Sequence, residues 1–238
     1  MIRSLALAAC VAVAASVGVE TARATNECRG LMICVPVAGP WVVVPAAGRR
    51  AEWQLTCPRG YIVGGLDAEL SARAVDVSFR GRLGSPVNPG ITTERSAVVE
   101  GHYTGRTRQA TTFRPHVGCV PASGGGGSPP PYITALRLAA PEAFPPGRPT
   151  VRRVRTAALG AGSRRVGVAC GANERLVAAS HAIGFHTQVT PAAAIVAAVR
   201  SSRVVRGRRV LVRVNVAPIA RNARAVVQVH AVCAGVGR

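Results

Sequence analysis

Two related stretches decide the fold. Residues 224–234 run Arg-Ala-Val-Val-Gln-Val-His-Ala-Val-Cys-Ala, and residues 109–120 run Gln-Ala-Thr-Thr-Phe-Arg-Pro-His-Val-Gly-Cys-Val. In both, a histidine precedes a cysteine by three residues within an apolar run that is typical of a β-strand. Because side chains alternate between the faces of a strand, Cys119 is predicted to point inward with Phe113, and His116 to point outward. The same pattern predicts an outward-facing His230.

The spacing of the cysteines is almost the same in both halves of the chain. Cys57 and Cys119 are 62 residues apart, and Cys170 and Cys233 are 63 residues apart. Six cysteines allow fifteen pairings, which counting alone does not separate. The matched spacing favours pairing within each half, and it leaves the close pair Cys28–Cys34 as a third bridge. The sequence therefore predicts three disulfides, two of which close long loops.

The N-terminus has the pattern of an export signal. Arg3 precedes an apolar stretch at residues 5–19, and Ala22-Arg23-Ala24 is a small-x-small cleavage site. Cleavage after Ala24 would give a mature chain that begins Thr25-Asn26-Glu27. The alternatives are a membrane anchor, for which the apolar stretch is short, and lipidation at Cys10, which too few apolar residues precede. An even number of mature cysteines fits an exported, disulfide-bonded protein.

Short alternating segments fill the remainder of the mature chain. Residues 51–57 place Ala51, Trp53 and Leu55 on one face, and residues 210–216 place four valines on one face. Arg206-Gly207 is a candidate hairpin turn before that strand. A strand is expected from Val196, although Thr190-Pro191 ahead of an alanine-rich run also allows a helix to begin there.

Composition divides the chain into parts. We expect a signal peptide at 1–24, a first β unit with an N-terminal cysteine loop at 25–122, a Gly/Pro-rich linker at 123–149 and a second β unit at 150–238. Residues 133–138, inside the linker region, can add a strand to either unit. The predicted class is all-β, with two similar antiparallel sandwich- or barrel-like units that are either separate domains or halves of one sheet system.

A resemblance supports this arrangement. The run Cys57-Pro-Arg-Gly-Tyr-Ile-Val-Gly-Gly65, closed by His116-Val-Gly-Cys119, resembles a repeated β module of secreted proteins from high-GC bacteria. Ala231-Val-Cys-Ala234 matches the closing strand of that module, whereas Cys170-Gly-Ala-Asn173 departs from its opening Cys-Pro-x-Gly. The resemblance implies export, β structure and disulfides, and it implies no activity.

Charge is the feature with most functional content. Residues 150–238 contain fifteen arginines and one acidic residue, Glu174, whereas residues 25–149 contain thirteen arginines and eight acidic residues. All thirty basic residues of the chain are arginine, which a GC-rich genome favours, but this bias does not explain the missing acids. A basic field attracts anionic partners, such as cell-wall polymers or acidic polysaccharides, with nucleic acid less favoured. The predicted focus of anion binding is Arg206, Arg208, Arg209 and Arg213.

Motifs for catalysis and cofactors are lacking. The chain has no Gly-x-Ser-x-Gly elbow, no P-loop and no His-Glu-x-x-His helix, and the cysteines lack the spacing of a zinc site. We therefore expect a non-enzymatic protein of the envelope or exterior, without cofactor or metal. The alternative is a secreted hydrolase or enzyme inhibitor that uses acidic residues of the first unit. Those residues are Asp67, Glu69, Asp76, Glu94 and Glu100.

Overall fold

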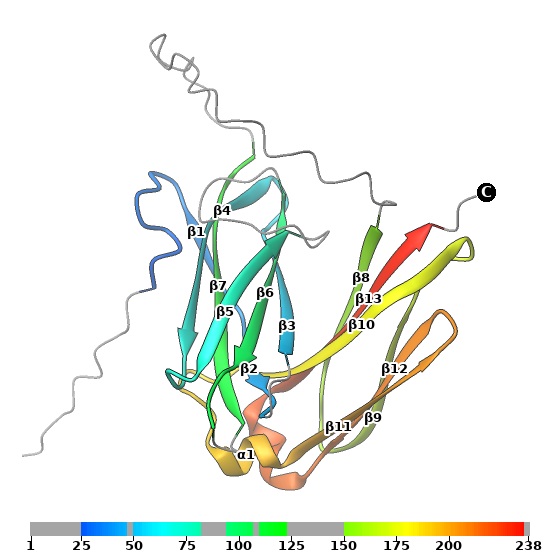
Figure 1. Ribbon diagram of the computed structural model, residues 1–238. Coiled ribbons are helices and arrows are strands. Elements are labelled where there is room, and N and C mark those ends of the chain that lie inside the picture. Colours follow the sequence, from blue (N-terminus) through cyan, green and yellow to red (C-terminus); the bar gives the residue numbers. More distant parts are fainter. Residues whose placement is uncertain (1–24, 47–49, 82–93, 107–109, 123–149, 236–238) are drawn as a thin grey trace, which may run out of the picture.

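The computed structural model describes residues 25–46, 50–81, 94–106, 110–122 and 150–235 (Figure 1). The predicted signal peptide at 1–24 and the predicted linker at 123–149, with its candidate strand at 133–138, lie outside the described residues.

The described residues form thirteen strands and two short helices. In chain order they are β1 (Val35–Ala38), β2 (Trp41–Val44), β3 (Arg50–Thr56), β4 (Tyr61–Leu70), β5 (Val75–Gly81), β6 (Ser96–Tyr103), β7 (Thr111–Pro121), β8 (Thr150–Ala158), β9 (Gly162–Ala169), β10 (Glu174–Phe185), α1 (Ala193–Ala197), β11 (Val199–Arg206), β12 (Arg209–Val216), the 3-10 helix η1 (Pro218–Ala223) and β13 (Ala225–Gly235). Neither helix is long and apolar enough to span a membrane.

The strands form three antiparallel sheets. The large sheet has the order β1-β7-β2-β10-β13-β8, with β4 also paired to β7, and the two smaller sheets have the orders β3-β6-β5 and β11-β12-β9. The predicted all-β class is confirmed, but the barrel-like alternative is wrong because the sheets stay open. The two halves of the chain are joined in one sheet, because Trp41 and Val42 on β2 pair with Phe185 and Gly184 on β10 (Figure 1).

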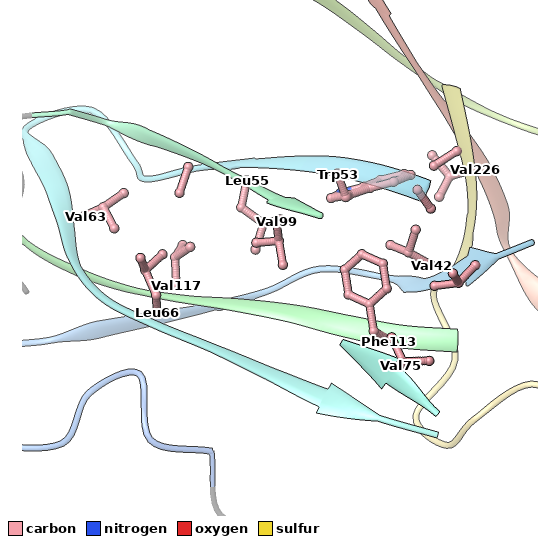
Figure 2. Close-up of a cluster of buried hydrophobic side chains, with 14 of the residues drawn as sticks. Val42, Trp53, Leu55, Val63, Leu66, Val75, Val99, Phe113, Val117 and Val226 are labelled. Carbon is pink, nitrogen blue, oxygen red and sulfur yellow. The ribbon is translucent and has the colours of Figure 1, made fainter. Parts of the chain in front are cut away.

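Two hydrophobic cores lie against the large sheet. The first core contains Trp53 and Leu55 of β3 and Phe113 of β7, and Figure 2 shows these side chains packed with Val42 and Val226. The second core contains the inward valines of β12 together with Ile183, Phe185, Val227 and Val229. Adjacent residues of β13 therefore enter different cores, and this strand is buried on both faces.

All three predicted disulfides are present. In each long-range bridge, the first cysteine directly follows a strand of a small sheet, and the second lies on a strand of the large sheet. These two bridges are Cys57–Cys119 and Cys170–Cys233. The third bridge, Cys28–Cys34, closes a short N-terminal loop. Each long-range bridge thus fastens a small sheet to the large one. In the chain-entropy model a loop of this length is worth roughly 4 kcal/mol of stability.

Two local predictions around the hairpin need correction. Arg206 pairs with Arg209, so the two-residue turn is Gly207-Arg208 and not Arg206-Gly207. Gly207 has φ of +53°, a conformation that glycine adopts without steric cost. The predicted strand from Val196 begins only at Val199, because the alanine-rich run forms helix α1, and alanine has the highest helix propensity.

Candidate functional site

The outer face of the sheet β11-β12-β9 is basic. On β12 the four valines are buried against the large sheet, and the intervening Arg209, Leu211, Arg213 and Asn215 are exposed. This strict alternation gives the strand one apolar face and one face open to solvent. The arginines of the exposed face therefore point away from the core.

The register of the neighbouring strands adds three more arginines to this face. Arg213 lies opposite Arg165 of β9, Arg209 lies opposite Arg206 of β11, and Asn215 lies opposite Arg200. Paired residues of antiparallel strands point to the same side of a sheet. We call Arg165, Arg200, Arg206, Arg209 and Arg213 the basic face. None of them forms an ion pair with a described residue, and the three strands contain no acidic residue.

The basic face is organised as two arginine pairs around an apolar centre. Cross-strand partners have Cβ atoms about 4.5–5.5 Å apart, so each pair can converge on one anion. Arg209 and Arg213 are four residues apart on one strand, which separates the two pairs by about 13 Å. Between the pairs lie Leu211 and Val204, which are 40% and 49% exposed.

A hollow of about 330 Å³ lies on this face. It is lined by Arg165, Ser202, Val204, Arg206, Leu211, Val212 and Arg213. Such a hollow offers both guanidinium donors and apolar contacts. The arrangement can hold an anionic group that also has an uncharged backbone.

Three of the four predicted anion-binding residues belong to this face. Arg206, Arg209 and Arg213 lie on it, but Arg208 sits in the turn, where its Nη1 donates to the carbonyl oxygens of Gly171 (2.7 Å) and Ala172. Arg208 thus fastens the turn to the segment after Cys170. Arg165 and Arg200 were missed, because only the pairing register brings them to the face.

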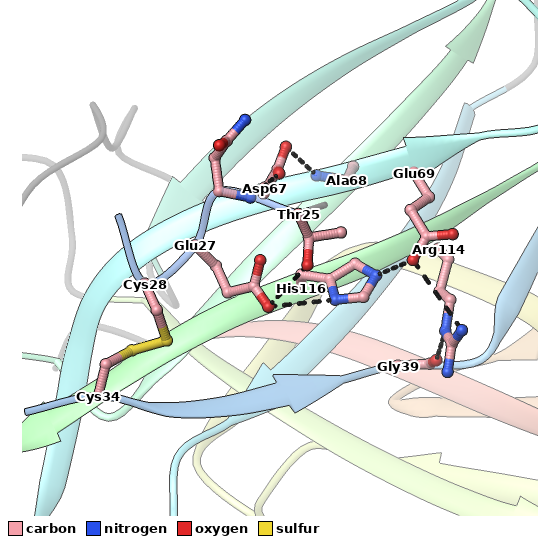
Figure 3. Close-up of polar contacts among 11 residues, drawn as sticks. Thr25, Glu27, Cys28, Cys34, Gly39, Asp67, Ala68, Glu69, Arg114 and His116 are labelled. Carbon is pink, nitrogen blue, oxygen red and sulfur yellow. Dashed lines mark hydrogen bonds and ion pairs between the residues drawn. A yellow bond between two sulfur atoms is a disulfide. The ribbon is translucent and has the colours of Figure 1, made fainter. Parts of the chain in front are cut away.

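The prediction that His116 faces solvent is wrong. Its side chain is buried between Glu27 and Glu69: Nδ1 lies 3.6 Å from Glu27 Oε1, and Nε2 lies 2.9 Å from Glu69 Oε1 (Figure 3). Arg114 Nη1 lies 4.0 Å from the same Glu69 oxygen. The N-terminal segment, residues 25–34, covers this face of the sheet, which simple alternation treats as open.

Two of the acidic residues proposed for a hydrolase line one pocket beside His116. Asp67 and Glu69 are two residues apart on β4 and face a pocket of about 460 Å³. Asp67 accepts hydrogen bonds from the backbone nitrogens of Asn26 (2.6 Å) and Ala68 (2.8 Å). Both carboxylates are therefore engaged as acceptors. Glu100 lies elsewhere, on β6, where it is buried in ion pairs with Arg50 and Arg80.

His230 is also buried, in a second polar cluster, so its predicted outward position is wrong as well. Arg152 Nη1 lies 3.1 Å from His230 Nδ1 and donates to Glu52 Oε2 at 2.7 Å. Ser180 Oγ donates to the same Glu52 oxygen at 2.7 Å. The four residues come from β8, β13, β3 and β10, and they tie the sheet β3-β6-β5 to the second half of the large sheet.

The environment shifts two pKa values in this cluster. Burial, followed by the charge of Arg152, lowers the pKa of His230 to about 4. Burial of Glu52 acts to raise its pKa, but the hydrogen bond and charge of Arg152 hold that pKa below its ordinary value. The cluster thus holds an ionised Glu52–Arg152 pair beside a neutral imidazole. Its serine donates to the carboxylate and not to the imidazole, unlike a Ser-His-acid triad.

A serine–histidine contact lies near the start of β11. His181 Nε2 is 2.9 Å from Ser201 Oγ beside a pocket of about 250 Å³, and burial, followed by the charge of Arg203, lowers the pKa of His181 to about 4. Its Nδ1 has no hydrogen-bond partner among the described residues. The acid that orients the base of a catalytic triad is therefore missing from this contact.

One group of metal-ligand side chains occurs in the described part of the chain. Cys170, Glu174 and Cys233 lie close together, but the two cysteines form a disulfide and offer no thiolate. This group therefore does not bind a metal as a thiolate site does.

Comparison with known proteins does not add a function to these structural features. No protein-family model, no curated protein and no solved structure matches this chain.

Proposed function

We propose that the chain is a non-enzymatic exported protein whose basic face binds anionic polymers of the cell envelope or exterior. In this proposal the signal peptide is removed after Ala24. The three disulfides support an oxidising destination, because such bonds persist mainly outside the cytosol. The resemblance to a secreted β module supports the same destination.

The observation behind the binding proposal is the basic face itself. Like charges placed directly opposite each other on neighbouring strands are destabilising, and here Arg165 faces Arg213 and Arg206 faces Arg209. An anion held between the members of a pair removes this repulsion. Guanidinium groups bind phosphate, sulfate and carboxylate oxygens through two parallel hydrogen bonds, which adds geometric fit to the charge attraction.

The spacing of the pairs favours a polymer over a single small anion. Two anion positions about 13 Å apart along β12 suit a chain that presents charges at regular intervals. The apolar centre of Leu211 and Val204 then contacts the uncharged part of the chain between two charges. We expect phosphate-linked or acidic polysaccharide polymers to fit this pattern.

Binding to immobilised anionic polymers tests the proposal. The variant Arg165→Ser/Arg209→Ser/Arg213→Ser should bind about tenfold more weakly or worse, and it should show a salt dependence that is shallower by about one unit for each lost contact. The matched control Arg29→Ser/Arg59→Ser/Arg106→Ser removes the same charge from exposed positions in the first half. Equal weakening in both variants would mean that net charge, and not the basic face, governs binding.

The alternative function, a secreted hydrolase or enzyme inhibitor, has one supporting observation. Asp67 and Glu69 line the same pocket, and successive same-face residues of a strand are about 7 Å apart, which is within the range of paired catalytic carboxylates. Asp67 accepts hydrogen bonds from two backbone nitrogens and Glu69 lies against His116 and Arg114, however, so neither carboxylate is placed as a proton donor. Hydrolysis of a glycan that is lost in Glu69→Gln would favour this alternative.

A further inference from the structure

The N-terminal segment lies directly on the backbone of the large sheet. Gly65 of β4 and Gly118 of β7 are paired across the sheet, and a Cβ atom on either would collide with the carbonyl oxygen of Glu27. Only glycine at both positions allows this approach. The two glycines therefore fix where Glu27 rests, and with it the position of the residues before it.

Those residues line the pocket that contains Asp67 and Glu69. Thr25 and Asn26 form part of its wall. The Asn26 backbone nitrogen donates to Asp67, and Thr25 Oγ1 donates to Glu27 Oε1 at 3.1 Å. Figure 3 shows Thr25 between the carboxylates of Glu27 and Asp67. The first described residues are thus held among acidic side chains.

One carboxylate oxygen in this arrangement lacks a donor. The Glu27 side chain is 5% exposed, and its Oε1 contacts both Thr25 and His116. Its Oε2 is buried and has no hydrogen-bond partner among the described residues. A buried carboxylate oxygen without a donor destabilises the fold. A cation or an N–H group close to Thr25 would therefore stabilise this site.

Processing of the chain supplies such a group. Hydrolysis of the Ala24–Thr25 bond by a signal peptidase adds one water: Ala24 departs with the new carboxylate, and the Thr25 nitrogen takes up a proton. The resulting ammonium has three N–H donors, and its nitrogen is three covalent bonds from the Oγ1 atom that already touches Glu27. The amide nitrogen of an uncleaved chain has one N–H and no charge.

We propose that Glu27, together with Asp67 and Glu69 of the adjacent pocket, binds the α-ammonium group of the chain's own mature N-terminus. This inference rests on the cleavage position in the proposed function and not on the binding of anionic polymers. The site makes removal of the signal peptide a stabilising step, because the new charge completes the contacts that hold residues 25–34 on the sheet.

The charges around the site define its pH behaviour. The facing groups are the carboxylates of Glu27, Asp67 and Glu69, the imidazole of His116, and the guanidinium groups of Arg73 and Arg114. An α-amino group has an ordinary pKa of about 7.7–8.0, and nearby carboxylates raise it. The stabilisation by the ammonium group is then complete below about pH 7.7, and it is lost as pH rises through the raised pKa of that group.

The sequence provides a direct assay, because it contains no lysine. The N-terminal amine is thus the sole primary amine of the mature chain, and an amine-acylating reagent reports on it alone. We would prepare disulfide-bonded protein that begins at Thr25 and a matched protein that begins at Ala22. Near neutral pH the Thr25 form should be acylated roughly tenfold more slowly, since each unit of raised pKa lowers the free amine tenfold. Its Tm should be higher by about 2–4 °C.

Variants connect the effect to the pocket. Glu27→Gln in the Thr25 form should restore fast acylation, and Asp67→Asn provides a second variant if Glu27→Gln does not fold. Asp76→Asn, which removes an exposed carboxylate from β5, should leave the acylation rate unchanged. Equal acylation rates and equal Tm values for the Thr25 and Ala22 forms would overturn the proposal.

The assay is independent of the proposed function. Both proteins have defined starting residues, so the comparison requires neither export nor a polymer. The intact mass of the protein recovered from an exporting host tests the cleavage position separately, and retention on anionic polymers tests the basic face.

Discussion

The buried Glu52–Arg152 pair should contribute strongly to stability. The Arg152 side chain is 6% exposed and the Glu52 side chain 18% exposed, with 2.7 Å between Arg152 Nη1 and Glu52 Oε2. Removal of one member of a fully buried pair costs about 3–5 kcal/mol, because the remaining charge stays buried without its partner. Partial exposure of Glu52 reduces this value, and we expect Glu52→Leu to lower the free energy of unfolding by about 2–4 kcal/mol.

Chemical denaturation followed by circular dichroism measures this effect. In thermal unfolding, the expected fall in Tm is roughly 5–15 °C, at about 2–4 °C for each kcal/mol of lost stability. The double variant Glu52→Leu/Arg152→Met should recover much of the loss, since apolar replacement of both charges is often neutral or stabilising. Asp76→Asn, at an exposed position, serves as the control. A loss below about 0.5 kcal/mol in Glu52→Leu, or no recovery in the double variant, would refute the assigned role.

Two further predictions concern pH and redox state. His181 has a pKa of about 4 in the folded protein, against about 6.5 when unfolded, so the unfolded chain binds more protons between these values and stability falls as pH drops from 6.5 to 4. Urea unfolding near pH 5 should show a proton uptake that is smaller by about one in His181→Asn than in the parent protein. Reduction of the bridges that contain Cys57 and Cys170 removes roughly 4 kcal/mol for each long loop, so reduced protein should be unfolded; an unchanged Tm in reductant would contradict this.

The disulfide framework and the alternating strands were predictable because their signals are local or countable. The matched spacing of the cysteines gave the correct pairing, and the valines of β12 alternate as strictly in the structure as in the sequence. Both are properties of the chain order alone. The pairing register that places Arg165 beside Arg213 depends on which strands become neighbours, and no local pattern specifies that.

The two histidine errors have one physical cause. Alternation predicts an exposed face only when one side of a strand meets solvent. His230 lies on a strand that is buried on both faces, and His116 lies under the N-terminal segment. Residues 225–234 are almost continuously apolar, which is the pattern of a strand that is covered on both sides. Gly118, beside His116, marks the close approach of the segment that covers it.

The sharing of β13 between two cores has a consequence for the order of folding. Val226 completes the first core, while Val227 and Val229 complete the second, and β13 is the last strand of the described chain. Neither core is therefore complete until β13 has docked. Once β13 docks, melting of either half exposes the same strand, so the two halves should unfold in a single cooperative transition.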